Sequence, residues 1–213
     1  MRALAQAVAA SILMFALGSG RAADVTRQEY LQAMRATPNL LHGRMIFTTC
    51  AMCHGAEGGG NSERSVPRIA GQHEGVIVRQ LVDYRHGKRW DDRMEAFTDE
   101  HMLRNFQDIA DIAGYVSQLQ FTGEVTRGDG ASLEKAALTY KRKCGSCHGA
   151  QGEGDGAKAV PKLSGQRYEY LLRQMYDATD GRRPNFSPAH LRLLRRMERD
   201  DFTGLADFLS RQR

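Results

Sequence analysis

The hydrophobic residues of the chain recur at helical rather than strand spacing. Two segments show this clearly, with apolar residues three and four positions apart: Ile109, Ile112, Ala113 and Val116 in one, and Phe202, Leu205, Ala206 and Leu209 in the other. These two patterns and similar ones elsewhere predict helices over residues 40–50, 74–85, 105–119, 132–144, 168–178 and 200–210. No segment alternates convincingly, as a strand with one buried face would. The pattern therefore predicts an all-α fold.

The predicted helices form two sets of three because the sequence is internally duplicated with a shift of 94 positions. The segment Val66–Gln72 (VPRIAGQ) corresponds to Val160–Gln166 (VPKLSGQ), and the same shift pairs Gly87 with Gly181. A repeat of this kind marks two copies of one structural unit. We therefore predict one domain over residues 40–121 and a second over 132–213, joined by a linker over 122–131.

The first 22 residues have the features of a secretory signal peptide. Arg2 precedes an apolar run over residues 3–17, and small residues follow with plausible cleavage sites after Ala22 and Ala23. The run is shorter than the roughly 20 residues that span a membrane. The alternative to cleavage is that the segment is retained as a membrane anchor. We expect export to the periplasm and an N-terminal extension over residues 23–39.

The net charge does not favour nucleic acid as a partner. The formal charge of +5 falls to +3 when Arg2 and Arg21 leave with the signal peptide. The positive residues are nevertheless crowded in one stretch, which contains Arg182, Arg183, Arg192, Arg195, Arg196 and Arg199. Such a run is ordinarily a solvated surface, but beside a functional site it would steer an acidic partner protein.

Two copies of the motif Cys-x-x-Cys-His account for all four cysteines of the chain. They are Cys50, Cys53 and His54 in the first half, and Cys144, Cys147 and His148 in the second. Thiols three positions apart can form thioethers with the two vinyl groups of one porphyrin, and the following histidine is then placed to bind the iron. The motifs therefore predict two covalently bound haem c groups with histidine as the proximal ligand.

Other uses of paired cysteines fit the sequence less well. A zinc ribbon needs its pairs about 15–20 residues apart, whereas 94 positions separate these two. Local disulfides or thioredoxin-like dithiols do not require a histidine directly after the second cysteine. Because a helical unit of about 90 residues has a modest core, we also expect each domain to need its haem in order to fold.

Small residues indicate where the first and last helices of each half cross. Gly43 and Ala137 each lie seven residues before the first cysteine of their motif. Tyr115 and Phe208 are the aromatic candidates on the facing helices. We expect close helix packing at both positions.

The chain resembles a tandem class I cytochrome c, and most of all the periplasmic dihaem cytochrome c-four type, over about residues 40–213. The resemblance rests on the two Cys-x-x-Cys-His-Gly-Ala motifs, on the Pro67 and Pro161 segments that end in Gly-Gln, and on the closing helices with the sequences Asp111–Tyr115 and Leu205–Phe208. It implies that each domain wraps around its haem. It also implies that the Pro67 and Pro161 carbonyls accept a hydrogen bond from the ligand histidines, which orients the rings and tunes the iron.

The sixth ligand decides whether each iron is closed. Members of the family usually place a methionine after the middle helix, which raises the potential and leaves no open position. Met94 matches this position in the first half, with His101 as the competitor. The second half offers no methionine there, so we predict His190, with Met197 as the competitor, and a lower potential for this bis-histidine haem. Three further histidines, expected to be surface residues rather than ligands, are His42, His73 and His86.

These features predict a carrier of single electrons. It would take electrons from a dehydrogenase or a quinol-oxidising complex and give them to a terminal oxidase or reductase, with redox proteins as partners and peripheral association with a membrane respiratory complex. One alternative is a dihaem enzyme of the peroxidase or thiosulfate-oxidising type, with an open iron. Others are an electron-accepting subunit of a dehydrogenase complex and a haem-based sensor.

Overall fold

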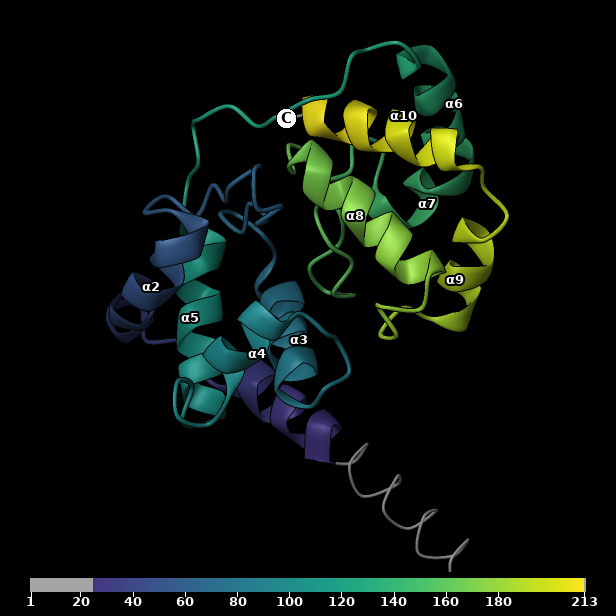
Figure 1. Cartoon of the computed structure of the whole chain (residues 1–213). Coiled ribbons are helices and arrows are strands. Elements are labelled where there is room, and N and C mark those ends of the chain that lie inside the picture. Colours follow the sequence, from purple (N-terminus) through teal and green to yellow (C-terminus); the bar gives the residue numbers. More distant parts are fainter. Residues whose placement is uncertain (1–24, 213) are drawn as a thin grey trace, which may run out of the picture.

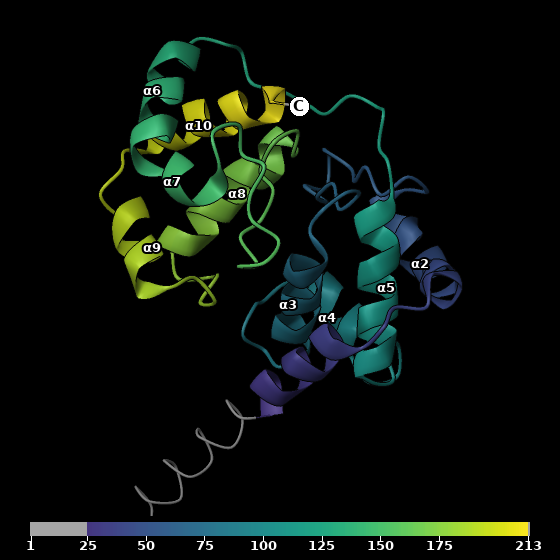
Figure 2. The same ribbon diagram turned by 180° about the vertical axis from the view of Figure 1, so that it is seen from behind.

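The computed structural model describes residues 25–212, and regular structure in this part of the chain is helical (Figure 1). The predicted signal peptide lies outside these residues. Two helical halves follow each other along the chain, and a view from behind shows the same division (Figure 2). Among the described helices, none has the length and apolar character needed to cross a membrane.

The first half begins with a helix at residues 25–35. It continues with α2 (Leu40–His54), α3 (Glu74–Arg85), α4 (Asp92–Thr98) and α5 (Phe106–Gln118). Asparagine caps start two of them, since Asn39 accepts a hydrogen bond from His42 N and Asn105 accepts one from Gln107 N. The three predicted helices are confirmed, whereas the helix at 25–35 and α4 are additions.

The second half contains α6 (Leu133–Lys143), α7 (Gly145–His148), α8 (Tyr168–Thr179), α9 (Pro188–Leu194) and α10 (Arg199–Arg211). The predicted helices are again confirmed, and α7 and α9 are additions. Ser187 caps α9 by accepting a hydrogen bond from His190 N, and Pro188 fits the first helical position because it needs no hydrogen-bonded N–H there. Glu198 and Asp201 form a capping box at the start of α10.

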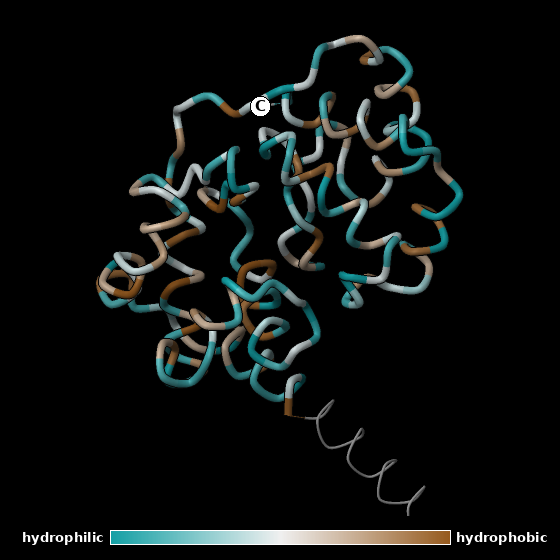
Figure 3. Tube along the Cα trace, viewed as in Figure 1, coloured by the Kyte–Doolittle hydropathy of each residue, from teal (hydrophilic) through white to brown (hydrophobic). Residues whose placement is uncertain are grey.

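Each half has a hydrophobic core of its own. The first core includes Phe47, Val78, Val82, Ile109 and Val116. The second includes Tyr140, Leu171, Ala178, Phe202 and Leu205. Apolar and polar segments alternate along the helices of both halves (Figure 3), as they do in helices with one buried face. Two separate cores make the halves distinct packing units.

The first and last helices of each half cross at a small residue, but the register of the crossing differs. Gly43 on α2 lies against Tyr115 on α5, as predicted. On α6 the buried small residue is Ala136, which faces Gly204 on α10, so the prediction of Ala137 is wrong by one position. The reason is that α2 runs through the haem motif without a break, whereas α6 ends before the second motif and α7 begins within it.

Aromatic pairs lie beside both crossings. The ring centroids of Phe47 and Tyr115 are 5.4 Å apart, and those of Tyr140 and Phe208 are also 5.4 Å apart. Tyr140 also donates a hydrogen bond to the carbonyl of Gly149, which directly follows the second motif, at 2.8 Å. The predicted roles of Tyr115 and Phe208 are therefore confirmed.

Replacing Gly43 by alanine is expected to destabilise the first half. A Cβ atom at this position would overlap the Asp111 carbonyl on α5, so the two helices would have to separate. Overpacking of this kind costs about 1–3 kcal/mol, and we expect the free energy of unfolding in denaturant titrations to fall by that amount. Gly145→Ala is the control, because its added Cβ would meet no atom closer than 3.6 Å. Equal stability of both variants would contradict the close crossing.

The loops repeat as closely as the helices. Isolated β-bridges pair Asn61 with Val66 and Asp155 with Val160. A Cβ atom at Gly60 would collide with the Val66 carbonyl, so only glycine lets the backbone approach so closely. Positive φ angles recur with the same shift, at Gly55, Gly58, Gly60, Gly71 and Gly87 and at Gly149, Gly152, Gly154, Gly165 and Gly181.

Two glutamines related by the repeat join the halves reciprocally. Gln72 accepts a hydrogen bond from Lys162 N and donates one to Lys162 O, both at 2.9 Å. Gln166 forms the same pair with Arg68 N and Arg68 O, at 2.8 and 2.7 Å. The interface therefore has approximate two-fold symmetry, because each half uses the same surface to contact the other.

Candidate haem sites

The histidine of each Cys-x-x-Cys-His motif is held by a prolyl carbonyl. His54 Nδ1 lies 3.0 Å from Pro67 O, and His148 Nδ1 lies 3.2 Å from Pro161 O. A carbonyl oxygen can only accept, so Nδ1 must carry the proton and the Nε2 lone pair is left for a metal. Burial lowers the pKa of both imidazoles, which favours this neutral form. The histidines are therefore prepared as iron ligands.

The four cysteines are free thiols on the same helical segments. Cys53 and Cys147 are exposed, whereas Cys50 and Cys144 are half-buried. Burial raises the pKa of Cys50 and of Cys144 to about 11. Reactive dithiols have a lowered pKa instead, so these pairs do not fit thioredoxin-like chemistry. Free thiols three positions apart, each pair followed by an oriented histidine, fit covalent haem attachment.

The structure brings His190 to the proximal histidine of the second half. The ring centroids of His148 and His190 lie 6.1 Å apart. Metal–imidazole bonds of about 2.0–2.1 Å leave room for one metal ion between two rings whose centroids are about 6 Å apart. Burial, His148 and Arg183 together lower the pKa of His190 to about 4, so its imidazole is neutral at pH 7. A neutral ring facing the proximal ligand fits a sixth iron ligand.

The position of Met197 does not favour this residue as the sixth ligand of the second haem. Met197 belongs to the hydrophobic core of the second half, in the turn before α10, and 9% of its surface is exposed. This is the environment of a packing residue. His190 lies on α9, and Phe186 packs against the edge of its ring at 4.6 Å.

In the first half, the predicted sixth ligand Met94 lies on α4 and is half-buried. Asp91 caps this helix by accepting a hydrogen bond from Arg93 N. The competitor His101 is exposed in the turn after α4. The helices predicted from the sequence do not include α4, although aspartate before a short polar-apolar segment is a helix-start signal.

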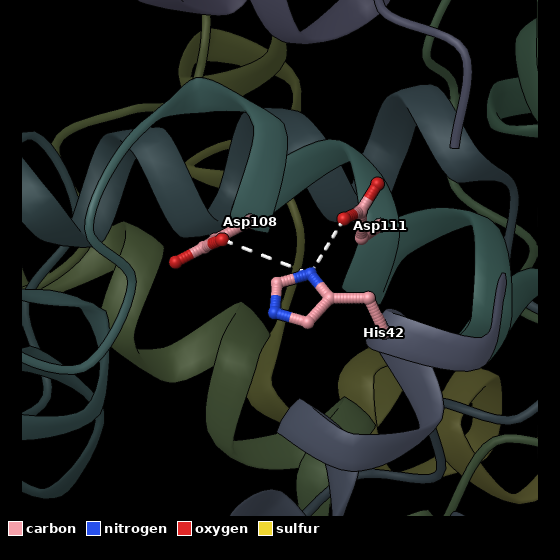
Figure 4. Close-up of side chains that lie close together, drawn as sticks. All are labelled: His42, Asp108 and Asp111. Carbon is pink, nitrogen blue, oxygen red and sulfur yellow. Dashed lines mark hydrogen bonds and ion pairs between the residues drawn. The ribbon is translucent and has the colours of Figure 1, made fainter. Parts of the chain in front are cut away.

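His42 is half-buried rather than free at the surface. Its Nδ1 lies 2.7 Å from Asp111 Oδ2 and 3.8 Å from Asp108 Oδ1 (Figure 4). The two carboxylates also accept hydrogen bonds from Arg104 and Gln107. The cluster is therefore a polar tie between α2 and α5, whose oxygen atoms already have partners.

His73 and His86 also have partners that the sequence did not reveal. His73 donates to the Glu153 carbonyl of the other half at 2.8 Å. His86 Nε2 lies 2.7 Å from Glu29 Oε2 on the N-terminal helix. Both histidines thus join separate parts of the structure.

Two arginines related by the repeat meet between the halves. Both donate to Gln80 Oε1, Arg89 at 2.6 Å and Arg183 at 3.4 Å, and Arg89 also donates to Tyr170 and Gln174. Within residues 25–212, neither guanidinium forms an ion pair with a carboxylate. Burial and the nearby Arg89 charge lower the pKa of Arg183 to about 10. Excess positive charge of this kind suits an anionic group of a cofactor.

The structure divides the arginine-rich stretch of the second half into two groups. Arg182 pairs with Asp177 and Asp180, and Arg199 lies near Asp180. Within the described residues, the exposed arginines of this stretch that form no ion pair with a carboxylate are Arg192, Arg195 and Arg196. These three lie on or directly after α9, two, five and six positions after His190 in the chain.

Two helical domains in tandem, each with a Cys-x-x-Cys-His segment and an oriented histidine, define a dihaem c-type cytochrome. A family model described as Cytochrome c matches residues 41–120 and 133–211. The chain belongs to the cytochrome c family. It carries two covalently bound haem c groups, as the motifs predict.

Individual proteins are similar over most of the chain. Cytochrome c4 from Azotobacter vinelandii is 31% identical over 157 residues, which cover 67% of this chain and 73% of that protein. A thiosulfate dehydrogenase electron acceptor from Stutzerimonas stutzeri is 31% identical over 170 residues, 76% of this chain and 77% of that one. The solved structure of reduced cytochrome c4 from Pseudomonas stutzeri has a TM-score of 0.72 at 26% identity, covering 83% of this chain and 100% of that one. The predicted all-α tandem fold, cytochrome c4 resemblance and electron transport are confirmed.

Proposed function

We propose that this chain is a periplasmic electron carrier with two closed haems that differ in their sixth ligand. His54 and Met94 would hold the iron of the first haem, and His148 and His190 that of the second. The 6.1 Å separation of the His148 and His190 rings carries the proposal. When bound, each haem supplies reversible one-electron chemistry.

The surrounding residues hold the ligands and set the difference between the sites. The Pro67 and Pro161 carbonyls orient the proximal rings in the same way, so the contrast arises at the sixth position. Methionine favours the reduced iron and histidine the oxidised iron, which gives the first haem the higher potential. Electrons would therefore move from the second half to the first.

Arg89 and Arg183 would balance the propionate groups of the haems. Their side chains lie between the halves and donate to neutral groups. A guanidinium binds carboxylates strongly in a partly buried site. We propose that this shared pair of cations couples the two haem sites.

The basic residues beside His190 favour an acidic donor protein. Arg192, Arg195 and Arg196 would raise the local concentration of a negatively charged partner at the second haem.

A relative named as a thiosulfate dehydrogenase electron acceptor supports a second candidate function, direct acceptance of electrons from a dehydrogenase. A closed iron at both sites favours either role over a peroxidase, which needs an open position. Export to the periplasm rests on the predicted signal peptide.

Spectroscopy of the unmutated oxidised protein tests the proposed ligands. We expect low-spin iron alone in electron paramagnetic resonance, together with the weak red absorption band that sulfur ligation gives to one ferric haem. A high-spin iron in this protein would indicate an open site. The enzyme or sensor function would then replace the carrier.

Neutralising the three free arginines is expected to slow electron transfer to anionic reagents. In the triple variant that combines Arg192→Gln, Arg195→Gln and Arg196→Gln, we expect oxidation of the second haem by ferricyanide at low salt to slow by about threefold to tenfold. Stopped-flow traces should converge with those of the unmutated protein at high salt, because ions screen exposed charges. The matched control removes three exposed charges from the first half: Arg27→Gln, Arg35→Gln, Arg44→Gln. An equal effect in both triples would contradict a local docking surface.

A further inference from the structure

The guanidinium of Arg85, at the end of α3, joins three separate segments of the first half. It donates to the Thr98 carbonyl at the end of α4 at 2.8 Å and to the Leu103 carbonyl in the following turn. It also forms an ion pair with Glu29 on the N-terminal helix. The second oxygen of Glu29 contacts His86 at 2.7 Å. One planar fork therefore connects α3, the N-terminal helix and the segment after α4.

Burial gives this connection its strength. The side chains of Arg85 and Glu29 are 6% and 16% exposed. An ion pair sheltered in this way is screened little by salt, and removal of one partner leaves an uncompensated buried charge. The tie is therefore expected to persist where an exposed pair would open.

The tie is specific to the first half. The repeat maps Arg85 onto Thr179, whose hydroxyl bonds to Met175 O and Tyr176 O of its own helix. The N-terminal helix also lies before both segments that match the cytochrome c family. It lies beside α3 and α4 in both ribbon views (Figures 1 and 2). An added helix and an added arginine thus act together on one haem domain.

The target of the tie is α4, which carries Met94. This helix has seven residues, too few to be stable alone. Its first turn is fixed by Asp91, which also pairs with Arg173 of the other half at 3.0 Å. Its last residue, Thr98, is fixed by Arg85. Both ends of the helix are thus anchored from outside.

We infer that Glu29 and Arg85 are positioning residues that keep Met94 on the iron of the first haem. This rests on the proposed ligation by Met94. In that case the Met94 sulfur alone would hold α4 to the iron, so the lifetime of the closed site would depend on how rarely the α4 segment opens. The tie between Glu29 and Arg85 lowers that opening frequency. The second half does not need such a tie, because its proposed sixth ligand is the imidazole of His190.

The rate at which cyanide displaces the sulfur ligand of the oxidised protein tests the inference. We expect the sulfur band to disappear at least about tenfold faster in Glu29→Gln and in Arg85→Met than in the unmutated protein, because each loses a buried charged hydrogen bond. The second haem has no sulfur band and should keep its low-spin resonance signal. Arg79→Met is the matched control. The Cζ atom of Arg79 lies 5.4 Å from the centroid of the Tyr30 ring on the N-terminal helix, and within the described residues Arg79 forms no hydrogen bond or ion pair with the segment after α4.

The outcomes separate this inference from the proposed ligand set. Unchanged rates in both variants, or equal acceleration in Arg79→Met, would overturn the positioning role. If Arg85→Met does not fold, Glu29→Gln decides alone, because the amide keeps the shape of the side chain. A sulfur band that survives in Met94→Ala would instead overturn the proposed ligand itself.

Discussion

Replacing His190 by alanine is expected to open the iron of the second haem to small ligands. The imidazole ring of His190 lies 6.1 Å from that of His148, and alanine removes the nitrogen that would hold the sixth position of the iron. We expect a new high-spin signal from one haem per chain in electron paramagnetic resonance, and carbon monoxide binding to the reduced protein. His190→Met should instead keep the site closed and raise the potential of the second haem, on the order of 0.1 V.

Two matched variants separate this role from its competitors. His101→Ala removes an exposed histidine of the first half. We expect this variant to show no high-spin resonance signal and no carbon monoxide binding. Met197→Leu keeps the volume of a core residue and should also leave the spectrum unchanged. A normal spectrum in His190→Ala, together with a high-spin signal in Met197→Leu, would assign the ligand to Met197.

Removing the second attachment site is expected to unfold one half of the protein. In the double variant Cys144→Ser, Cys147→Ser the second haem cannot be attached covalently. The core of the second half is small and needs the apolar porphyrin ring for its side chains to pack against. We expect one haem per chain and loss of roughly half of the helical circular dichroism signal, because the halves contain similar lengths of helix. Limited proteolysis should then cut within residues 132–212 and spare the first half.

The repeat provides the reciprocal control. Cys50→Ser, Cys53→Ser should unfold the first half, including the helix at residues 25–35, which packs into the first core through Ala33. The second half should keep its haem and its helices. Full helical signal in either variant with one haem per chain would mean that a domain folds without its haem.

Much of the fold follows from local sequence patterns. Helix α3 has the bounds predicted from its periodicity, and α5 and α10 differ from theirs by one residue at each end. The hydrogen bonds of Pro67 and Pro161 appear where the family resemblance places them. Periodicity and motif spacing act over a few turns of chain, so they can be recognised without knowing the tertiary contacts.

The missing elements are those that depend on distant contacts. Helices α4 and α9 have seven residues each and lack a full amphipathic pattern. The crossing register of Ala136 depends on a helix break at the haem motif, which the repeat alone does not show. The domain limits at residues 121 and 132 remain predictions.

The cofactor, the duplication and the helical class follow from the amino-acid sequence, because the attachment motifs, the repeat and the helical periodicity can be recognised along the chain without knowledge of the fold. Three contacts appear only once the chain is folded: His190 with His148, Glu29 with Arg85, and Arg89 with Gln174. Those contacts join positions 42 to 85 residues apart in the chain. Whether such contacts form depends on how deeply the side chains are buried and on the entropy of closing the loops between them. Neither quantity can be derived from the local sequence pattern.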